Sequence, residues 1–296
     1  MSPSEPGSPG SPVRYSRGAW QGAVDKHLLR AQRHTLPHRE RRTRGEHHPV
    51  WDFLFDYYPV RASQLERWHP GLWALLADAP DAPHSSYPHY VTAGDGTVRF
   101  DADGFLAKRR GDMERILHLL EATAGRQAHF DCFGMHEWAM VYQGEPRHKL
   151  PLRLGRDGTD RVVESHQLKC SHFDAYRFFT PAAAPLNLTV LHRASQAEHD
   201  QPGCLHVAMD LYKWAAKMGP VVPGELLLDA FELAAEARRL DMEASPYDCR
   251  GLGFEVVPVE TPEGKATYVA RQRELADAAE PIRARLVALL TDLLNR

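Results

Sequence analysis

The segment from Cys204 to Trp214, "CLHVAMDLYKW", is the feature that most restricts how this 296-residue chain can fold. Residues four apart lie on the same face of a helix, so His206 and Asp210 are predicted to be neighbours, with Lys213 one turn further along the same side. The other positions are apolar nearly all round, which predicts a buried helix. Buried charges are costly unless they are paired or ligated. The fold must therefore bring partners to these three side chains.

A second segment, "KCSHFDAYRFFTP" (169–181), poses the same problem, because it places His172 and Asp174 among large aromatic residues. The two residues are two apart, a spacing that points both side chains to one face of a β-strand. We expect the preceding residues, "VVESHQLKCSHF", to supply that strand, and they include His166. A third apolar segment, "CFGMHEWAMVYQ", contains His136. All these polar groups are predicted to belong to one buried site.

Three hypotheses account for such a site. In the first, it binds one divalent Fe, Zn or Mn ion through Asp174 or Asp210 together with histidines. The histidines that would serve as ligands are His136, His166, His172 and His206. In the second, Asp174 or Asp210 activates water while His172 moves the proton, or a desolvated Lys213 with a lowered pKa acts as a nucleophile. In the third, the residues form a structural hydrogen-bond network, or they belong to a binding module without chemistry.

Aromatic residues crowd the same segments and indicate a type of ligand. Most of them are expected in the core, while a few would stack on a planar ring such as a nucleobase. The residues that we expect to bind a substrate of this kind are Trp138, Tyr142, Tyr176, Arg177 and Tyr212.

The rest of the chain predicts a mainly α (α+β) fold, a single compact helical domain with a small β-hairpin or sheet. The tract "MSPSEPGSPGSP" lacks apolar surface, so we expect residues 1–15 to be a disordered leader and residues 16–296 to form one globular catalytic domain. Periodicity predicts helices over 20–44, 106–125 and 223–242, and a C-terminal helix from Arg271 that is interrupted at Pro281. The turn Gly94-Asp95-Gly96 predicts a hairpin. Two further short strands are expected over 254–261 and 265–270.

Composition excludes several classes of protein. A net charge of -3 and a pI near 6.6 provide no overall positive field that would attract nucleic acid or an anionic membrane. The four cysteines form no CxxC pair, so neither a disulfide framework nor a zinc ribbon is expected. No apolar run reaches the length of a membrane span, and no signal peptide precedes the body of the chain. We therefore expect a cytoplasmic protein with no membrane partner and no obvious protein partner.

Several long motifs resemble an actinobacterial family commonly labelled 3-methyladenine DNA glycosylase. The resemblance extends from about Pro49 to the C-terminal helix. The motifs that carry it are "HPVWDFLFDYYPVR", "HEWAMVYQ", "HFDAYRFFTP", "QPGCLHVAMDLYKWA" and "ELLLDAFELAAEARRLDMEASPYD".

The resemblance implies a DNA-repair hydrolase that cleaves the N-glycosidic bond of an alkylated purine in damaged DNA. The base would be flipped into an aromatic pocket, where Asp174 or Asp210 would activate water. The chain lacks the LPGVG-type hairpin of helix–hairpin–helix glycosylases, so no catalytic position is carried over from that group. The alternative is a metal-dependent enzyme acting on a small aromatic or nucleobase-like molecule.

Overall fold

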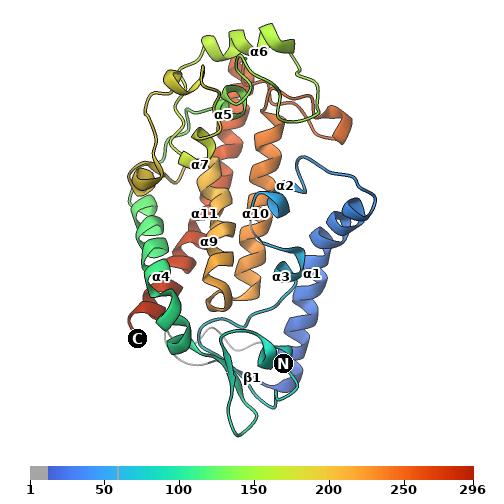
Figure 1. Ribbon diagram of the computed structural model, residues 1–296, viewed down its shortest axis with the longest axis vertical. Helices are drawn as coiled ribbons and strands as arrows, with labels where there is room; N and C mark the ends of the chain where they lie inside the picture. Colours follow the sequence, from blue (N-terminus) through green and yellow to red (C-terminus); the bar gives the residue numbers. More distant parts are fainter. Residues whose placement is uncertain (1–12, 59) are drawn as a thin grey trace.

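Long helices form the centre of the molecule in the computed structural model, which describes residues 13–58 and 60–296. The fold is mainly α with a small sheet, as the sequence predicts. Three helices run side by side along the long axis, with one helix on either flank and the sheet at one end (Figure 1). The long helices are α1 (Arg17–Thr43), α4 (Ala102–Ala124), α9 (Leu205–Met218), α10 (Gly224–Glu243) and α11 (Pro262–Leu294). The shorter ones are α2 (Phe53–Asp56), α3 (Ala62–Leu65), α5 (Met135–Ala139), α6 (Gly155–Glu164), α7 (Phe173–Tyr176) and α8 (Gln196–His199).

Helix α10 is the central element of the bundle. Leu228, Ala234 and Leu240 are each 0% exposed, and at 100° per residue they lie about 120° apart around the helix. Buried apolar side chains on several sides of a helix need neighbours on those sides, and α10 packs against α9, α11 and α1. The helix predicted over 223–242 is confirmed, and α4 likewise matches its prediction, with Gly125 at its C-terminal cap.

Helix α11 begins earlier than the sequence analysis expected. The chain from 265 to 270, expected as a strand, is helical, and the helix starts at Pro262. The local reason is a start signal: the Thr261 side chain accepts a hydrogen bond from the Gly264 N–H, and a proline occupies the first helical position. The strand expected over 254–261 is also wrong, because that stretch is irregular and ends in a turn.

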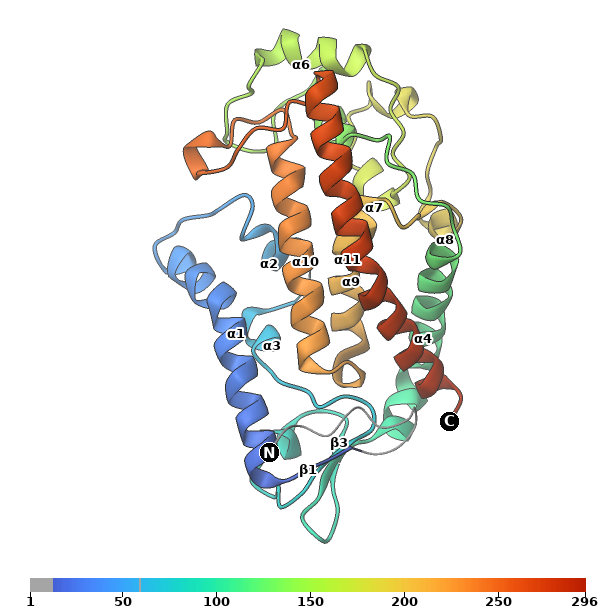
Figure 2. The ribbon, with the colours of Figure 1, turned by 180° about the vertical axis from the view of Figure 1, so that it is seen from behind.

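The expected interruption at Pro281 is absent, since α11 continues through it to Leu294 (Figure 2). Proline removes one backbone hydrogen bond and crowds the preceding turn. Buried side chains on both sides of it, including Ala279, Leu286 and Leu290, hold the helix against its neighbours. Tertiary packing therefore outweighs the local preference.

The sheet has four short strands in the order β1-β2-β4-β3. The predicted hairpin is confirmed: β3 (Tyr90–Thr92) pairs antiparallel with β4 (Val98–Phe100) around Gly96, whose φ of +78° suits a residue without a Cβ. Strand β1 (Val13–Tyr15) pairs parallel with β2 (Ala74–Leu76). The leader expected at 1–15 thus falls mostly outside the described residues, and its last three residues are ordered in the sheet.

No helix formed by residues 13–58 and 60–296 combines the length and the apolar character needed to cross a bilayer.

Candidate functional site

Helix α9 carries a stripe of polar side chains, as its sequence predicts. His206, Asp210, Lys213 and Lys217 follow one another at spacings of four, three and four residues, so they lie along one side of the helix. The helix starts after Gly203 and ends at Gly219, whose φ is +59°. Two clusters of buried polar groups meet this stripe, one beside His206 and the other beside Asp210 and Lys213.

The second cluster is an ion-pair network centred on Lys213. Its ammonium donates to the carboxylate of Asp210 and, at 3.3 Å, to Oδ2 of Asp174. The Tyr58 hydroxyl donates to Asp210 Oδ1 over 3.0 Å. Burial favours the neutral amine, but the two carboxylates outweigh it and raise the pKa of Lys213 above its ordinary value. The lowered pKa expected for a nucleophilic Lys213 therefore finds no support in its surroundings.

Asp174 reaches this network from α7 and not from a strand. His172 is the N-cap of that one-turn helix and Asp174 lies in its first turn, so the strand expected here does not form. Arg193 Nη2 lies 2.6 Å and Arg177 Nε lies 3.1 Å from Asp174 Oδ1. Burial favours the neutral acid, but Lys213 and the other nearby positive groups outweigh it and lower the pKa of Asp174.

His172 joins the same network through its two ring nitrogens. Nδ1 lies 3.0 Å from Asp200 Oδ1, and Nε2 lies 3.6 Å from Asp210 Oδ2. Asp200 is itself fixed by the Gln196 amide, which donates to Oδ2 over 2.8 Å. Burial opposes the charged imidazolium, but Asp200 and then Asp210 outweigh burial and raise the pKa of His172.

The first cluster joins α5 to α10. His136 Nε2 and Asp241 Oδ1 are hydrogen-bonded at 2.6 Å. The guanidinium of Arg238, 2% exposed, donates to Asp241 Oδ2 at 2.5 Å and to Glu137 Oε1 at 2.8 Å. Burial favours neutral Asp241, but His136 and Arg238 outweigh burial and hold the pKa of this carboxyl well below its usual range.

His206 lies between the two clusters. Its ring is edge-on to His136, with centroids 4.2 Å apart, and stacked on His172 at 5.5 Å. Among residues 13–58 and 60–296, neither of its ring nitrogens has a hydrogen-bond partner. Burial, followed by the charge of His136, lowers the pKa of His206 well below its ordinary value. His206 therefore presents a neutral imidazole with a free lone pair.

Two groups of side chains in the described part of the chain place three potential metal-ligand atoms within 4.8 Å of one another. One is His136, His206 and Asp241, and the other is His172, Asp174 and Asp210. His166, which the sequence suggested as a fourth ligand, belongs to neither group. It lies just beyond α6, where its Nδ1 is 2.6 Å from the Val162 carbonyl oxygen.

A small cavity lies beside His206 and His136. Its volume of about 20 Å³ is enough for about one water molecule. Tyr268, 0% exposed, lines this cavity, and its hydroxyl has no hydrogen-bond partner within the described residues. Burying an unpaired hydroxyl costs about 1–3 kcal/mol, so a group bound in the cavity is its natural partner.

The aromatic residues expected to bind substrate are mostly structural. Trp138 is fully buried and its indole N–H donates to the Ala244 carbonyl at 2.9 Å. Tyr142 and Tyr212 pack in the main hydrophobic core. Tyr176 is half-buried against Phe179, with ring centroids 5.2 Å apart. Arg177 pairs with Asp174, and its guanidinium lies 4.3 Å from the centroid of the Phe178 ring.

Sequence reasoning missed several members of the two clusters. Asp241 and Arg238 stand three apart on the buried side of α10, but most of the other charged residues of that helix are exposed or half-buried, so the sequence did not single these two out. Asp200 lies in a polar loop, and Tyr58 lies among many aromatics, so neither carries a recognisable local signal. Only the fold brings them to His172 and Asp210.

Comparison with known proteins identifies no relative. No protein-family model, curated protein or solved structure matches the chain.

Proposed function

We propose that this chain is a metal-dependent enzyme in which His136, His206 and Asp241 hold one divalent Fe, Zn or Mn ion. The supporting observation is that three separate helices, α5, α9 and α10, place these three ligand atoms within 4.8 Å of one another. Two imidazoles and one carboxylate suit these metals and leave coordination positions open for water and substrate. The cavity beside His206 has room for that water.

Charge balance favours this group over the other one. Arg238 is the only Arg or Lys paired with Glu137 and Asp241 in the described structure, so the second carboxylate charge is balanced by the proton shared with His136, which a bound cation would replace. In the network of Asp174 and Asp210, the ammonium of Lys213 already occupies the position that a cation would take.

A metal ion would enter the first group in place of a shared proton. His136 Nε2 and Asp241 Oδ1 are 2.6 Å apart, whereas nitrogen and oxygen ligands on a tetrahedral ion lie about 3.4 Å apart. The pair would open by about 0.8 Å, and binding would release a proton. Metal affinity is therefore expected to rise with pH.

We propose a small aromatic or nucleobase-like substrate, because Phe179 and Tyr268 line the cavity that the open coordination positions would face. Cleavage of an N-glycosidic bond stays a prediction from the family resemblance. Asp174 and Asp210, the carboxylates suggested as activators of water, already accept hydrogen bonds from Lys213, Arg193 and Tyr58.

The test is elemental analysis of protein purified without a histidine tag or chelator. We expect about one equivalent of Fe, Zn or Mn in the parent protein, and its loss in His206→Ala with little change in thermal stability. The matched control is His166→Ala, which removes an imidazole outside both clusters and should keep its metal. The metal found also points to the chemistry: Zn to hydrolysis, Fe to oxygen chemistry.

Two results would overturn the proposal. One is a parent protein that carries no metal and takes up none on dialysis against Fe²⁺, Mn²⁺ or Zn²⁺. The other is a folded His206→Ala variant that retains stoichiometric metal. In either case, release of free base from alkylated duplex DNA without added metal becomes the deciding assay.

A further inference from the structure

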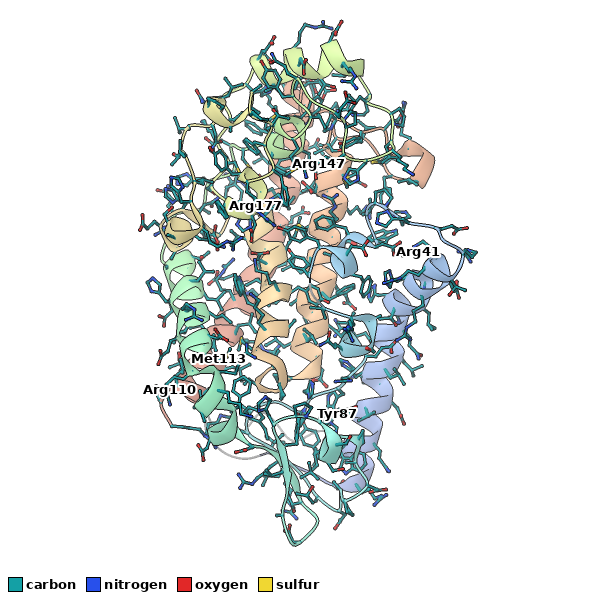
Figure 3. All side chains as sticks on the ribbon, viewed as in Figure 1. Arg41, Tyr87, Arg110, Met113, Arg147 and Arg177 are labelled. Carbon is teal, nitrogen blue, oxygen red and sulfur yellow. The ribbon has the colours of Figure 1, made fainter. Side chains whose placement is uncertain are left out.

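A second pocket, of about 230 Å³, opens at the far end of α9 from His206. Lys213 follows His206 by seven residues and Lys217 by eleven, which places the pocket about 10 to 16 Å further along the helix axis. Figure 3 shows Tyr87, one of its lining residues, below the lower ends of α9 and α10, well away from Arg177 near the ion-pair network. The polar residues that line it are Gln64, Arg67, His69, His89, Lys213 and Lys217.

The charges of this pocket are unbalanced. No Asp or Glu is among its described lining residues. In the described structure neither Arg67 nor Lys217 has a carboxylate partner, and each lies over an aromatic ring instead. The guanidinium of Arg67 is 5.0 Å from the Tyr87 ring centroid, and the ammonium of Lys217 is 5.1 Å from that of Trp214. Two unpaired cations at the mouth of one pocket attract an anion.

The deeper walls of the pocket are apolar or neutral. Ala215 is buried and Leu227 is 8% exposed. His69 is hydrogen-bonded to the Tyr90 hydroxyl through Nδ1 at 2.9 Å, and burial lowers the pKa of His69 to about 3, so the ring is neutral at pH 7. It adds a polar edge without a charge.

The backbone at the pocket is also unusual. His89 has a φ of +66°, a conformation that residues with a Cβ adopt rarely. Its carbonyl accepts a hydrogen bond from the Asp101 N–H at 2.9 Å, which holds the chain in this state. Such conformations cost about 1–3 kcal/mol and cluster at binding sites.

We infer that this pocket binds a small organic anion, a carboxylate or phosphate monoester joined to a flat apolar group. The acid group would pair with Arg67 and Lys217, where Arg presents a fork that matches either acid. The flat group would lie against Tyr87 and the apolar wall. The ligand's charge would also approach Lys213, so the pocket and the ion-pair network share one cation. The inference is independent of metal binding at His206.

Isothermal titration with phenyl phosphate, benzoate and neutral benzyl alcohol tests this inference. We expect both acids to bind the parent protein at least tenfold more tightly than the alcohol. The double variant Arg67→Gln/Lys217→Gln should lose at least tenfold in affinity for phenyl phosphate. The matched control, Lys108→Gln/Arg110→Gln on α4, removes the same charges at exposed positions that do not line the pocket, and it should bind as the parent does. Arg110 lies on the flank of the molecule, away from Tyr87 (Figure 3).

NMR of the His69 ring gives a second measurement, because an anion bound in the pocket should raise the pKa of His69. Inorganic phosphate, which lacks the flat apolar group, serves as the comparison ligand. Equal binding of phenyl phosphate and benzyl alcohol would overturn the inference. So would a double variant that binds phenyl phosphate as well as the α4 control does. If inorganic phosphate binds as tightly as phenyl phosphate, the inference that the ligand carries a flat apolar group is refuted.

Discussion

Replacing Lys213 by Met tests whether the ion-pair network is held together by this ammonium. Met keeps most of the side-chain volume but leaves Asp210 and Asp174 buried beside each other without their shared cation. Removing one partner of a buried pair typically costs 3–5 kcal/mol. Asp174 keeps Arg193 and Asp210 keeps Tyr58. We therefore expect the low end, a loss of about 3 kcal/mol in the free energy of unfolding at pH 7.

The matched control is Lys217→Met, one turn further along α9. Both lysines lie over the Trp214 ring, at 4.3 and 5.1 Å, so the loss of that contact largely cancels between the two variants. Lys217 has no carboxylate partner in the described structure, so its replacement should change the free energy of unfolding by less than about 0.5 kcal/mol. Urea denaturation followed by circular dichroism measures the free energy of unfolding of both variants. In thermal denaturation we expect the melting temperature of Lys213→Met to fall by about 6–12 °C.

The pH dependence of the same measurement separates charge from packing. Lys213 helps to lower the pKa of Asp174 in the folded state. A carboxyl whose pKa is lower in the folded state stabilises the fold at pH values above its pKa in the unfolded chain, near 3.9. That stabilisation is lost as the pH falls from there through the pKa of the folded state. The difference between Lys213→Met and the parent should therefore be largest near pH 7 and shrink as the pH falls below about 3.9. A loss below about 1 kcal/mol at pH 7, or one of equal size at pH 7 and near pH 2, would refute the reasoning.

Two further predictions concern charges outside the clusters. Arg283 is 1% exposed and bonds only to Glu280, while its Nε and Nη2 have no partner in the described chain. In urea denaturation, Arg283→Met should therefore leave the free energy of unfolding unchanged or raise it by up to about 2 kcal/mol. A loss above about 1 kcal/mol would contradict this. Burial opposes the charge of Asp52, but Arg41 and His38 outweigh it and lower its pKa to about 2. A carboxyl whose pKa is lower in the folded than in the unfolded state stabilises the fold at pH values above its unfolded pKa. Asp52→Asn should therefore lower the free energy of unfolding by about 2 kcal/mol at pH 7 and by little near pH 2. A loss that does not depend on pH would show that the ion pairs of Asp52 contribute nothing.

Much of the fold could be predicted from local patterns. The helices α4, α9 and α10 follow from the 3.6-residue spacing of their apolar residues, and the hairpin at Gly96 from its turn residues. Errors arose where a short apolar run fits both a strand and a helix. The run at 265–270 was one of these, and the Thr261-Pro262 start signal decides it as helix.

The candidate site was predictable in part, for a similar reason. The buried stripe of His206, Asp210 and Lys213 is a property of one helix, so its residues are neighbours in any fold that keeps α9. His136 and His172 were suspected because they interrupt apolar segments. Their distances from the stripe were not predictable, because separations between segments depend on how the helices pack.

The sequence by itself thus determined that polar groups would be buried along α9 and would need partners. Only the tertiary structure decided which partners they have: Lys213 neutralises Asp174 and Asp210, whereas His206 remains free beside His136 and Asp241. The physical reason is that the positions of side chains along one helix are set by its backbone, and so by residues that are close in the sequence. Which side chains of α5, α7, α9 and α10 come into contact is set by the packing of the entire core, so the partners of each buried charge depend on that packing.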